Sequence, residues 1–300
     1  MDEATFGDER TLRATASPTV AGDWSLVLAS AGIAHRVVEG QGAFALVVEA
    51  GDAAPASAAL AAFDAESVPA VVPPAPDLGP SALGVLAAAA IVAMFVVAGG
   101  LESAKPSAWF DVGSASAALI LRGQWWRVFT ALTLHADLLH VVGNVLACLI
   151  FVSAVGRWVG AGLGATLIVG AAGAANALTA LKHRTDFVSV GASTATFAAL
   201  GVIAGLQLVR RWRYDLRRRY AWLPLGAGLG IVAMLGVGEH ADVWAHLFGL
   251  AMGAVGGAGV AAAGVRAPGR LGQTLLTLAV SAVLVGAWVV AFRATGRVPS

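Results

Sequence analysis

From about residue 82 onward, apolar residues form long runs separated by short polar stretches. Seven runs are recognisable, at 82–99, 138–156, 161–180, 192–209, 221–237, 245–264 and 273–291. A helix needs about 20 apolar residues to cross the roughly 30 Å hydrocarbon core of a bilayer. The pattern therefore predicts seven membrane-spanning helices.

The pattern before residue 67 is different, because its apolar runs are short. It predicts a helix over 25–31 that is capped by Asp23, a hairpin of strands at 35–39 and 43–49, and a second helix over 52–66. Residues 1–20 show no such pattern, and we expect them to be disordered. We interpret 1–66 as a small soluble α/β domain and the Pro-rich stretch 67–80 as a linker.

Composition supports a membrane location for most of the chain. Hydrophobic residues make up 58% and charged residues 12% of the sequence, whereas a soluble domain carries about 25% charge. The chain has one cysteine, so an intramolecular disulfide is excluded. The sequence has no basic stripe with interleaved aromatic residues, so nothing in it points to a nucleic-acid partner.

Basic residues predict the orientation of the predicted spans. Arginines crowd the 210–219 loop, and Arg157, Arg266 and Arg270 fall on the same side. The positive-inside rule places that side, with the N-terminus, in the cytoplasm. The basic residues at 182, 184, 293 and 297 oppose this assignment. We therefore expect a multi-pass protein of the cell (inner) membrane, with the N-terminus cytoplasmic.

Polar residues inside predicted spans are costly, and four of them stand out. His140 and Asn144 share one helix face at the start of the second span. Ser193 begins the fourth span among small residues, and His246 begins the sixth. The topology places all four near the outer ends of their spans.

This set contains what acyl transfer requires: a nucleophile, a general base and hydrogen-bond donors for an oxyanion. The spacing of Gly249 and Gly253 predicts a small-residue face that lets span six pack closely on span four. Each residue also has a structural explanation. A serine can bond its own helix backbone, and His140 with Asn144 can simply hold helices together.

The ordered motifs resemble the rhomboid family of intramembrane serine proteases. They are Trp126-Arg127, the H-x-x-x-x-H-x-x-x-N pattern from His135 to Asn144, the G-A-S-T around Ser193 and the A-H-L-F-G-L-A-M-G that contains His246. The resemblance covers roughly residues 82–265 and implies an all-α polytopic membrane protein. It implies a six-helix protease domain at 81–265 and an additional seventh helix within 266–300, the "6+1" form of bacterial members.

The resemblance also implies roles for these residues. Ser193 would be the nucleophile and His246 the base of a Ser–His dyad. His140, Asn144 and the Ser193 backbone N–H would bind the oxyanion, and Phe197 would pack on the imidazole. The aromatic segment 100–137 would correspond to the family's membrane-embedded first loop. No cofactor or metal is implied, and the expected partners are transmembrane protein substrates and the lipid bilayer. The partner of the N-terminal domain stays unknown.

Two positions depart from the family pattern. Thr194 stands where a glycine usually follows the serine, and no glutamate occurs near the end of span two, where this chain reads Ala154-Val155-Gly156-Arg157. The first change could narrow the site, and the second could alter how the first loop is anchored.

Two other functions stay open. A proteolytically inactive rhomboid-like protein would use the fold for binding or quality control, although the retained Ser193 and His246 argue against it. A small transporter would carry polar residues through the full membrane depth, whereas here they cluster at one end. The sequence contains no H-E-x-x-H motif, which argues against an intramembrane zinc protease.

Overall fold

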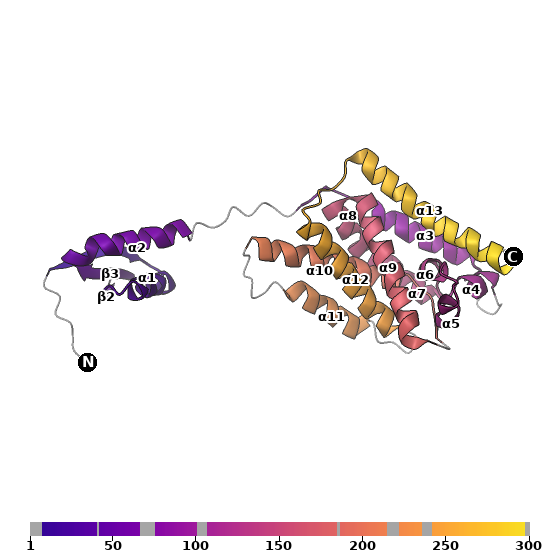
Figure 1. The fold of residues 1–300 in the computed structure, drawn as a ribbon, viewed down its shortest axis with the longest axis horizontal. Helices are drawn as coiled ribbons and strands as arrows, with labels where there is room; N and C mark the ends of the chain where they lie inside the picture. Colours follow the sequence, from indigo (N-terminus) through magenta and orange to yellow (C-terminus); the bar gives the residue numbers. More distant parts are fainter. Residues whose placement is uncertain are drawn as a thin grey trace. The chain divides into compact units, whose positions relative to one another are not determined.

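The computed structural model describes residues 8–40, 42–66, 76–100, 107–184, 187–214, 222–235 and 242–297. The chain divides into two compact units, residues 1–72 and 73–300 (Figure 1). The break falls inside the predicted 67–80 linker, of which residues 67–75 lie outside the described ranges.

The first unit is a three-stranded antiparallel sheet with two helices. Its elements are β1 (Glu9–Thr15), α1 (Pro18–Ser30), β2 (His35–Gly40), β3 (Ala43–Glu49), η1 (Ala50–Asp52) and α2 (Ala53–Glu66). The strand order is β1-β3-β2, so β3 lies in the centre. Leu28, Leu46, Val48, Ala56 and Leu60 form its buried core.

Two predictions about the start of this unit are wrong. Residues 9–15 form strand β1, although we expected disorder over 1–20. The strand was missed because its residues are mainly polar. It is an edge strand stabilised by backbone pairing with β3, and Leu12 packs against the core. Helix α1 begins at Pro18 and is capped by Ser17, whose hydroxyl accepts from the Val20 N–H, so Asp23 lies inside the helix.

The second unit is helical. Its elements are α3 (Leu83–Val97), α4 (Ala108–Gly113), β4 (Ala115–Ser116), α5 (Ala117–Leu121), α6 (Arg127–Thr130), η2 (Ala131–Thr133), α7 (Leu138–Ala147), η3 (Cys148–Val152), α8 (Ser153–Val159), α9 (Ala161–His183), β5 (Val188–Ser189), α10 (Ser193–Arg213), α11 (Leu223–Leu235), α12 (Val243–Ala262) and α13 (Arg270–Thr295).

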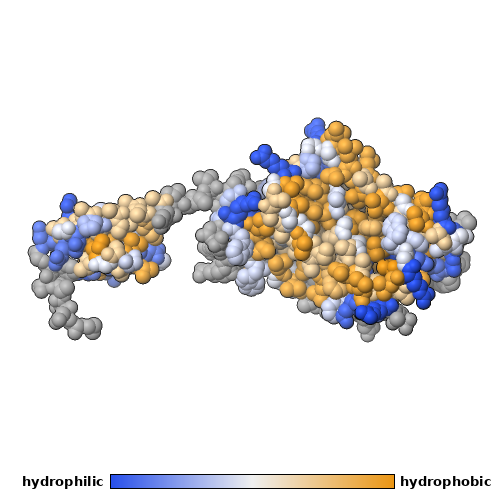
Figure 2. All heavy atoms as spheres, in the orientation of Figure 1, coloured by the Kyte–Doolittle hydropathy of each residue, from blue (hydrophilic) through white to orange (hydrophobic). Residues whose placement is uncertain are grey.

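Each of the seven predicted spans contains a helix. Within the described residues, five helical stretches are long and apolar enough to cross a membrane: Leu138–Val159, Ala161–His183, Ser193–Arg213, Val243–Ala262 and Arg270–Thr295. The second span is one continuous helix, in which η3 is a π-helical turn between α7 and α8. Helix α3 is apolar but has only 15 residues, and 13 residues of α11 are described. The chain is therefore an all-α polytopic membrane protein with a small sheet at its N-terminus. Figure 2 shows apolar residues spread broadly over the visible surface of this unit, as expected for a surface that faces lipid.

Helices α10 and α12 lie against each other with their backbones nearly in contact (Figure 1). A Cβ added at Gly253 would lie 2.1 Å from the Ala198 carbonyl oxygen, and one at Gly249 would lie 2.7 Å from that of Thr194. From the other side, a Cβ at Gly201 would lie 2.1 Å from the Leu250 carbonyl oxygen. The predicted small-residue packing of span six on span four is confirmed.

The aromatic segment between α3 and α7 is folded around a buried arginine. The Arg127 guanidinium donates to the carbonyl oxygens of Ser114 and Asp111, each at 2.8 Å, and to Gln124 Oε1 at 2.7 Å. Its acceptors are two carbonyls and an amide, so the segment is held without a glutamate from the end of span two. Burial lowers the pKa of Arg127 from its usual value, partly offset by nearby Asp111.

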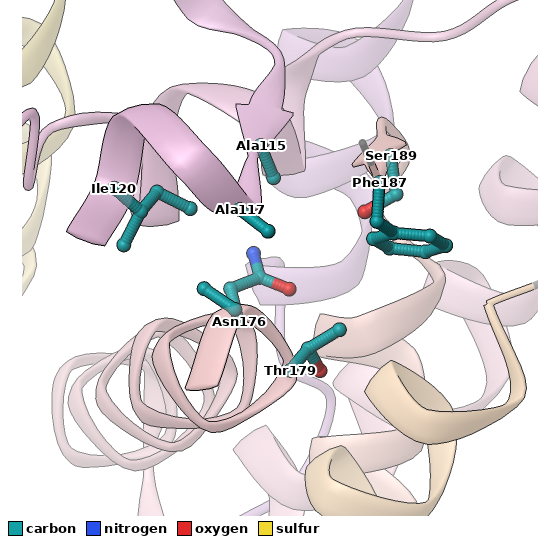
Figure 3. Close-up of a pocket in the computed structure, with 8 residues that line it drawn as sticks. Ala115, Ala117, Ile120, Asn176, Thr179, Phe187 and Ser189 are labelled. Carbon is teal, nitrogen blue, oxygen red and sulfur yellow. The ribbon is translucent and has the colours of Figure 1, made fainter. Parts of the chain in front are cut away.

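Helix α9 packs against the same aromatic segment. Asn176 Nδ2 donates to the Val128 carbonyl oxygen at 2.9 Å. Figure 3 shows Asn176 and Thr179 on α9 facing Ala117, with Phe187 and Ser189 on the neighbouring segment that contains strand β5. The short strands β4 and β5 pair here, which joins the aromatic segment to the chain that leads into α10.

Helix α13 is attached near both of its ends. At its start, Gln273 Oε1 accepts from the N–H groups of Gly162 and Leu163, and Gln273 Nε2 donates to the Val159 carbonyl oxygen. Gln273 therefore caps α9, which has no capping side chain of its own. Towards its end, Trp288 donates to Thr133 Oγ1 at 3.2 Å and packs edge-on against Trp109.

We predict that Arg127→Leu lowers the free energy of unfolding by about 2–5 kcal/mol, because it leaves buried carbonyl groups without donors. Arg122→Leu is the matched control, since Arg122 is exposed on the same segment. Unfolding in detergent, followed by tryptophan fluorescence, measures both. Equal destabilisation by the two variants would contradict the role given to Arg127.

Candidate functional site

The first residue of α10 and the fourth residue of α12 meet at the candidate site. Ser193 Oγ lies 2.9 Å from His246 Nε2, which is a hydrogen-bond distance. The close approach of α10 to α12 determines this distance, because both residues lie within one turn of the Gly249 crossing.

The His246 ring is buried against Phe197, and the backbone of His246 is held by the first turn of α12. Its side chain is 4% exposed, and its ring centroid lies 4.5 Å from that of Phe197, with 35° between the planes. Phe197 is thus in contact with the imidazole. The His246 N–H donates to the Asp242 carbonyl oxygen, as the first turn of α12 requires.

Asp242 acts as the N-cap of α12. Its Oδ1 accepts from the Ala245 N–H at 2.9 Å, and its Oδ2 is buried without a hydrogen-bond partner among the described residues. Asp242 is therefore a partly buried helix cap. Burial, the largest effect, raises the pKa of this carboxyl. The carboxylate positions the helix that carries His246 through its backbone.

Three successive attachments hold the chain just before Ser193. Strand β5 pairs with β4, the Gly191 N–H donates to the Ala131 carbonyl oxygen at 2.9 Å, and the Ala192 N–H donates to His135 Nε2 at 3.2 Å. Gly191 has a φ of 130°, a conformation that side chains disfavour. The nucleophile candidate therefore begins its helix from a fixed backbone.

His135 is the first residue of the H-x-x-x-x-H-x-x-x-N pattern, and the sequence alone assigned it no role. The structure places it beside Ala192, with 1% of its surface exposed. Because the Ala192 N–H can only donate, His135 Nε2 must be the acceptor and the neutral ring carries its proton on Nδ1. No sequence signal distinguished this contact, since it joins residues 57 positions apart.

His140 and Asn144 lie one turn apart on α7. Asp137 caps this helix by accepting from the His140 N–H at 2.8 Å. The Asn144 side chain is buried, and one of its Nδ2 hydrogens is used within the helix, on the His140 carbonyl oxygen at 2.9 Å. The amide has a second hydrogen for a ligand.

A Cβ atom built on Gly191 shows that the His140 ring lies next to this glycine. A Cβ there would lie 2.6 Å from His140 Nε2 and 3.7 Å from Ser193 Oγ. The His140 ring and the Ser193 hydroxyl therefore both lie beside Gly191, and a methyl group at Gly191 would collide with the His140 ring.

Thr194 is buried at the α10–α12 crossing, at 5% exposure. The α12 backbone at Gly249 meets the carbonyl oxygen of Thr194. The β-branched residue is thus compatible with the 2.9 Å separation of Ser193 and His246.

These features define a class: a polytopic membrane protein with a Ser–His pair at the start of two closely packed helices. The family model for the rhomboid domain matches residues 122–263. The chain is 29% identical over 145 residues to the rhomboid protein YdcA of Bacillus subtilis (strain 168), which covers 48% of this chain and 72% of that protein.

Two further relatives match over a similar region. Rhomboid protease GluP of Bacillus subtilis is 32% identical over 186 residues, 60% of this chain and 33% of GluP. RHOMBOID-like protein 1 of Arabidopsis thaliana is 31% identical over 129 residues, 43% of this chain and 32% of that protein. The chain thus spans about a third of the length of these two. No solved structure matches.

The rhomboid domain matched at residues 122–263 and the two Bacillus relatives support membership of the rhomboid family. The resemblance noted from the motifs is confirmed at this level.

We predict that His135→Leu lowers the free energy of unfolding by about 1–3 kcal/mol at neutral pH, because the buried Ala192 N–H loses its acceptor. His135→Gln is the matched control, since its Oε1 also accepts a hydrogen bond. Unfolding in detergent at pH 7.5 tests this prediction. An equal loss in both variants would contradict it.

The same residue predicts a pH dependence. Burial, followed by the charge of His140, lowers the pKa of His135 from 6.5 to about 4. The neutral ring therefore stabilises the fold fully above about pH 6.5, and this stabilisation is lost as the pH falls towards 4. The loss is on the order of 3 kcal/mol. His135→Gln should unfold with a flatter pH profile, and an unchanged profile would assign the effect to other groups.

Proposed function

We propose that this protein is an intramembrane serine protease that hydrolyses peptide bonds in or near transmembrane segments of membrane-protein substrates. The observation that carries the proposal is the 2.9 Å contact between Ser193 Oγ and His246 Nε2 in a membrane-spanning fold. Membership of the rhomboid family supports it, as does the description of GluP as a rhomboid protease.

In the proposed mechanism, His246 Nε2 takes the proton of Ser193 as its Oγ attacks the scissile carbonyl carbon. The negative charge that develops on the carbonyl oxygen accepts hydrogen bonds from His140, Asn144 and the Ser193 N–H. His246 then gives its proton to the leaving amine, and an acyl-enzyme remains on Ser193. Water activated by His246 hydrolyses that ester and restores the hydroxyl.

The substrate must present an extended carbonyl to this site. A transmembrane helix satisfies its own carbonyl groups, so it has to unwind locally before Ser193 can attack. Segments with small or helix-breaking residues near the membrane surface fit this requirement. The proposal uses no metal or cofactor.

The domain organisation belongs to the same proposal. Residues 81–265 form the protease domain, and 266–300 supply an additional transmembrane helix. Residues 1–66 form a cytosolic accessory domain, joined by the 67–80 linker. Residues of this stretch are held at one end of the second unit, where Asp77 pairs with Arg157 and the Leu78 N–H donates to the Arg157 carbonyl oxygen. The salt bridge lowers the pKa of Asp77.

We also propose that the site opens to the outer side of the inner membrane. Helix α10 begins at Ser193 and ends in a turn that contains Arg210, Arg211 and Arg213. The positive-inside rule puts this arginine-rich end in the cytoplasm and Ser193 at the opposite face.

The alternative is a rhomboid-like protein without proteolytic activity that binds membrane proteins or acts in quality control. Thr194 is the residue that favours it. The contact between Ser193 and His246 favours the protease, because a purely structural role does not require an imidazole aimed at a hydroxyl.

We predict that a fluorophosphonate probe labels Ser193 in the purified protein, because the reagent reacts with a serine activated by a base and needs no substrate. His246→Ala should abolish labelling, and Ser281→Ala, a serine on the exposed side of α13, should leave it unchanged. Cleavage of a single-span model substrate should follow the same pattern. Labelling or cleavage that persists in Ser193→Ala would refute the assignment of the nucleophile.

We predict that His140→Ala lowers kcat by about 10²–10³-fold with a small change in KM, since it removes a donor that acts on the transition state. Asn144→Ala should have a smaller effect, because part of its amide is engaged by the His140 carbonyl. Equal values of kcat/KM in wild type and His140→Ala would remove His140 from the oxyanion site.

A further inference from the structure

A groove of about 320 Å³ lies between α10 and α11, away from the Ser193 end of α10. Its walls come from two helices that face the membrane. The lining residues are Leu200, Ile203, Ala204, Gln207 and Arg211 on α10, with Leu223 and Ala227 on α11.

The lining changes from apolar to charged along α10. Leu200 and Ile203 are followed one turn later by Gln207, and after another turn by Arg211. At 1.5 Å per residue, Leu200 and Arg211 are about 16 Å apart along the axis. That length is close to the hydrocarbon thickness of one leaflet, about 15 Å. The groove therefore has the polarity and length of half a bilayer.

The side chains of two donors at its charged end, Gln207 and Arg211, have no partner among the residues that the structure describes. Gln207 lies in a membrane-spanning helix, where a polar side chain needs a partner. Neither Gln207 nor Arg211 makes a hydrogen bond or ion pair with any residue that the structure describes. An amide and a guanidinium one turn apart offer several N–H groups to an oxyanion.

The residues around Arg211 are of the types that lie at the level of lipid headgroups. Arg210 and Arg213 lie in the same turn as Arg211. Trp212 and Trp222 are 53% and 58% exposed, as tryptophans at a membrane interface are. Basic pockets between transmembrane helices bind anionic headgroups.

We propose that this groove binds one anionic phospholipid. Its phosphate accepts hydrogen bonds from Arg211 and Gln207, and one acyl chain runs along Leu200, Ile203 and Leu223. The basic turn of α10, which the sequence explains as a topology determinant, thereby has a second role. This site is independent of the proposed proteolysis, and its test uses no substrate.

The experiment measures lipid retention by the full chain. The protein is reconstituted with equal amounts of phosphatidylglycerol and phosphatidylcholine, and bound lipid is counted by native mass spectrometry after mild detergent extraction. Wild type should retain one phosphatidylglycerol. Arg211→Gln should weaken that binding about tenfold, as expected when a charge-assisted hydrogen bond is lost.

Two further variants separate the groove from general charge. Arg213→Gln removes the same charge from the same turn, but Arg213 does not line the groove and donates to the Ala262 carbonyl oxygen, so lipid retention should persist. Ala227→Phe keeps every charge and fills the groove from an exposed position on α11, so retention should fall. Unfolding in detergent confirms that each variant is folded.

Several results would overturn the proposal. These are no retained lipid in wild type, equal retention of the two lipids, equal loss in Arg211→Gln and Arg213→Gln, or full retention in Ala227→Phe. Displacement of phosphatidylglycerol by a single-span helical peptide would assign the groove to a protein segment, and would also overturn it.

Discussion

The close approach of α10 to α12 is the constraint on which the candidate site depends. Without side chains at Gly249, Gly253 and Gly201, each helix meets carbonyl groups of the other. A hydrophobic driving force between helices is absent in lipid, so small residues and close van der Waals contact supply the association. A methyl group at any of these positions would collide with the facing backbone and push the helices apart. The contact between Ser193 and His246 therefore depends on residues that take no part in it.

The second support of the site is the folded segment around Arg127. Without this buried guanidinium, the carbonyl groups of Asp111 and Ser114 would lose a donor in an apolar setting. Through β4 the segment pairs with β5, and through Ala131 and His135 it fixes the backbone of Gly191 and Ala192. The position of Ser193 is thus determined by a segment about 60 residues earlier in the chain. A neutral set of acceptors around Arg127 replaces the carboxylate that the family pattern suggested.

Local patterns predicted the helices well, because apolar run length and G-x-x-x-G spacing act over short distances. A helix in each of the seven predicted spans, five of them long enough to cross a membrane within the described residues, and the packing on Gly253 needed nothing beyond the sequence. Strand β1 was missed because an edge strand buries so little that its pattern stays polar. The contact of His135 with Ala192, the cap that Gln273 provides to α9 and the attachment of Trp288 were also missed. Each of these joins a side chain to a group far away in sequence, and no periodicity encodes such a pair.

The attachments of α13 have a consequence for the order in which the protein is made. Gln273 supplies the cap of α9, and Trp288 closes the aromatic segment, yet both residues are synthesised after all the helices that they stabilise. During insertion, α9 must enter the membrane with the N–H groups of Gly162 and Leu163 lacking that acceptor. The start of α9 and the aromatic segment therefore reach their final packing only after α13 has been made and has docked on them.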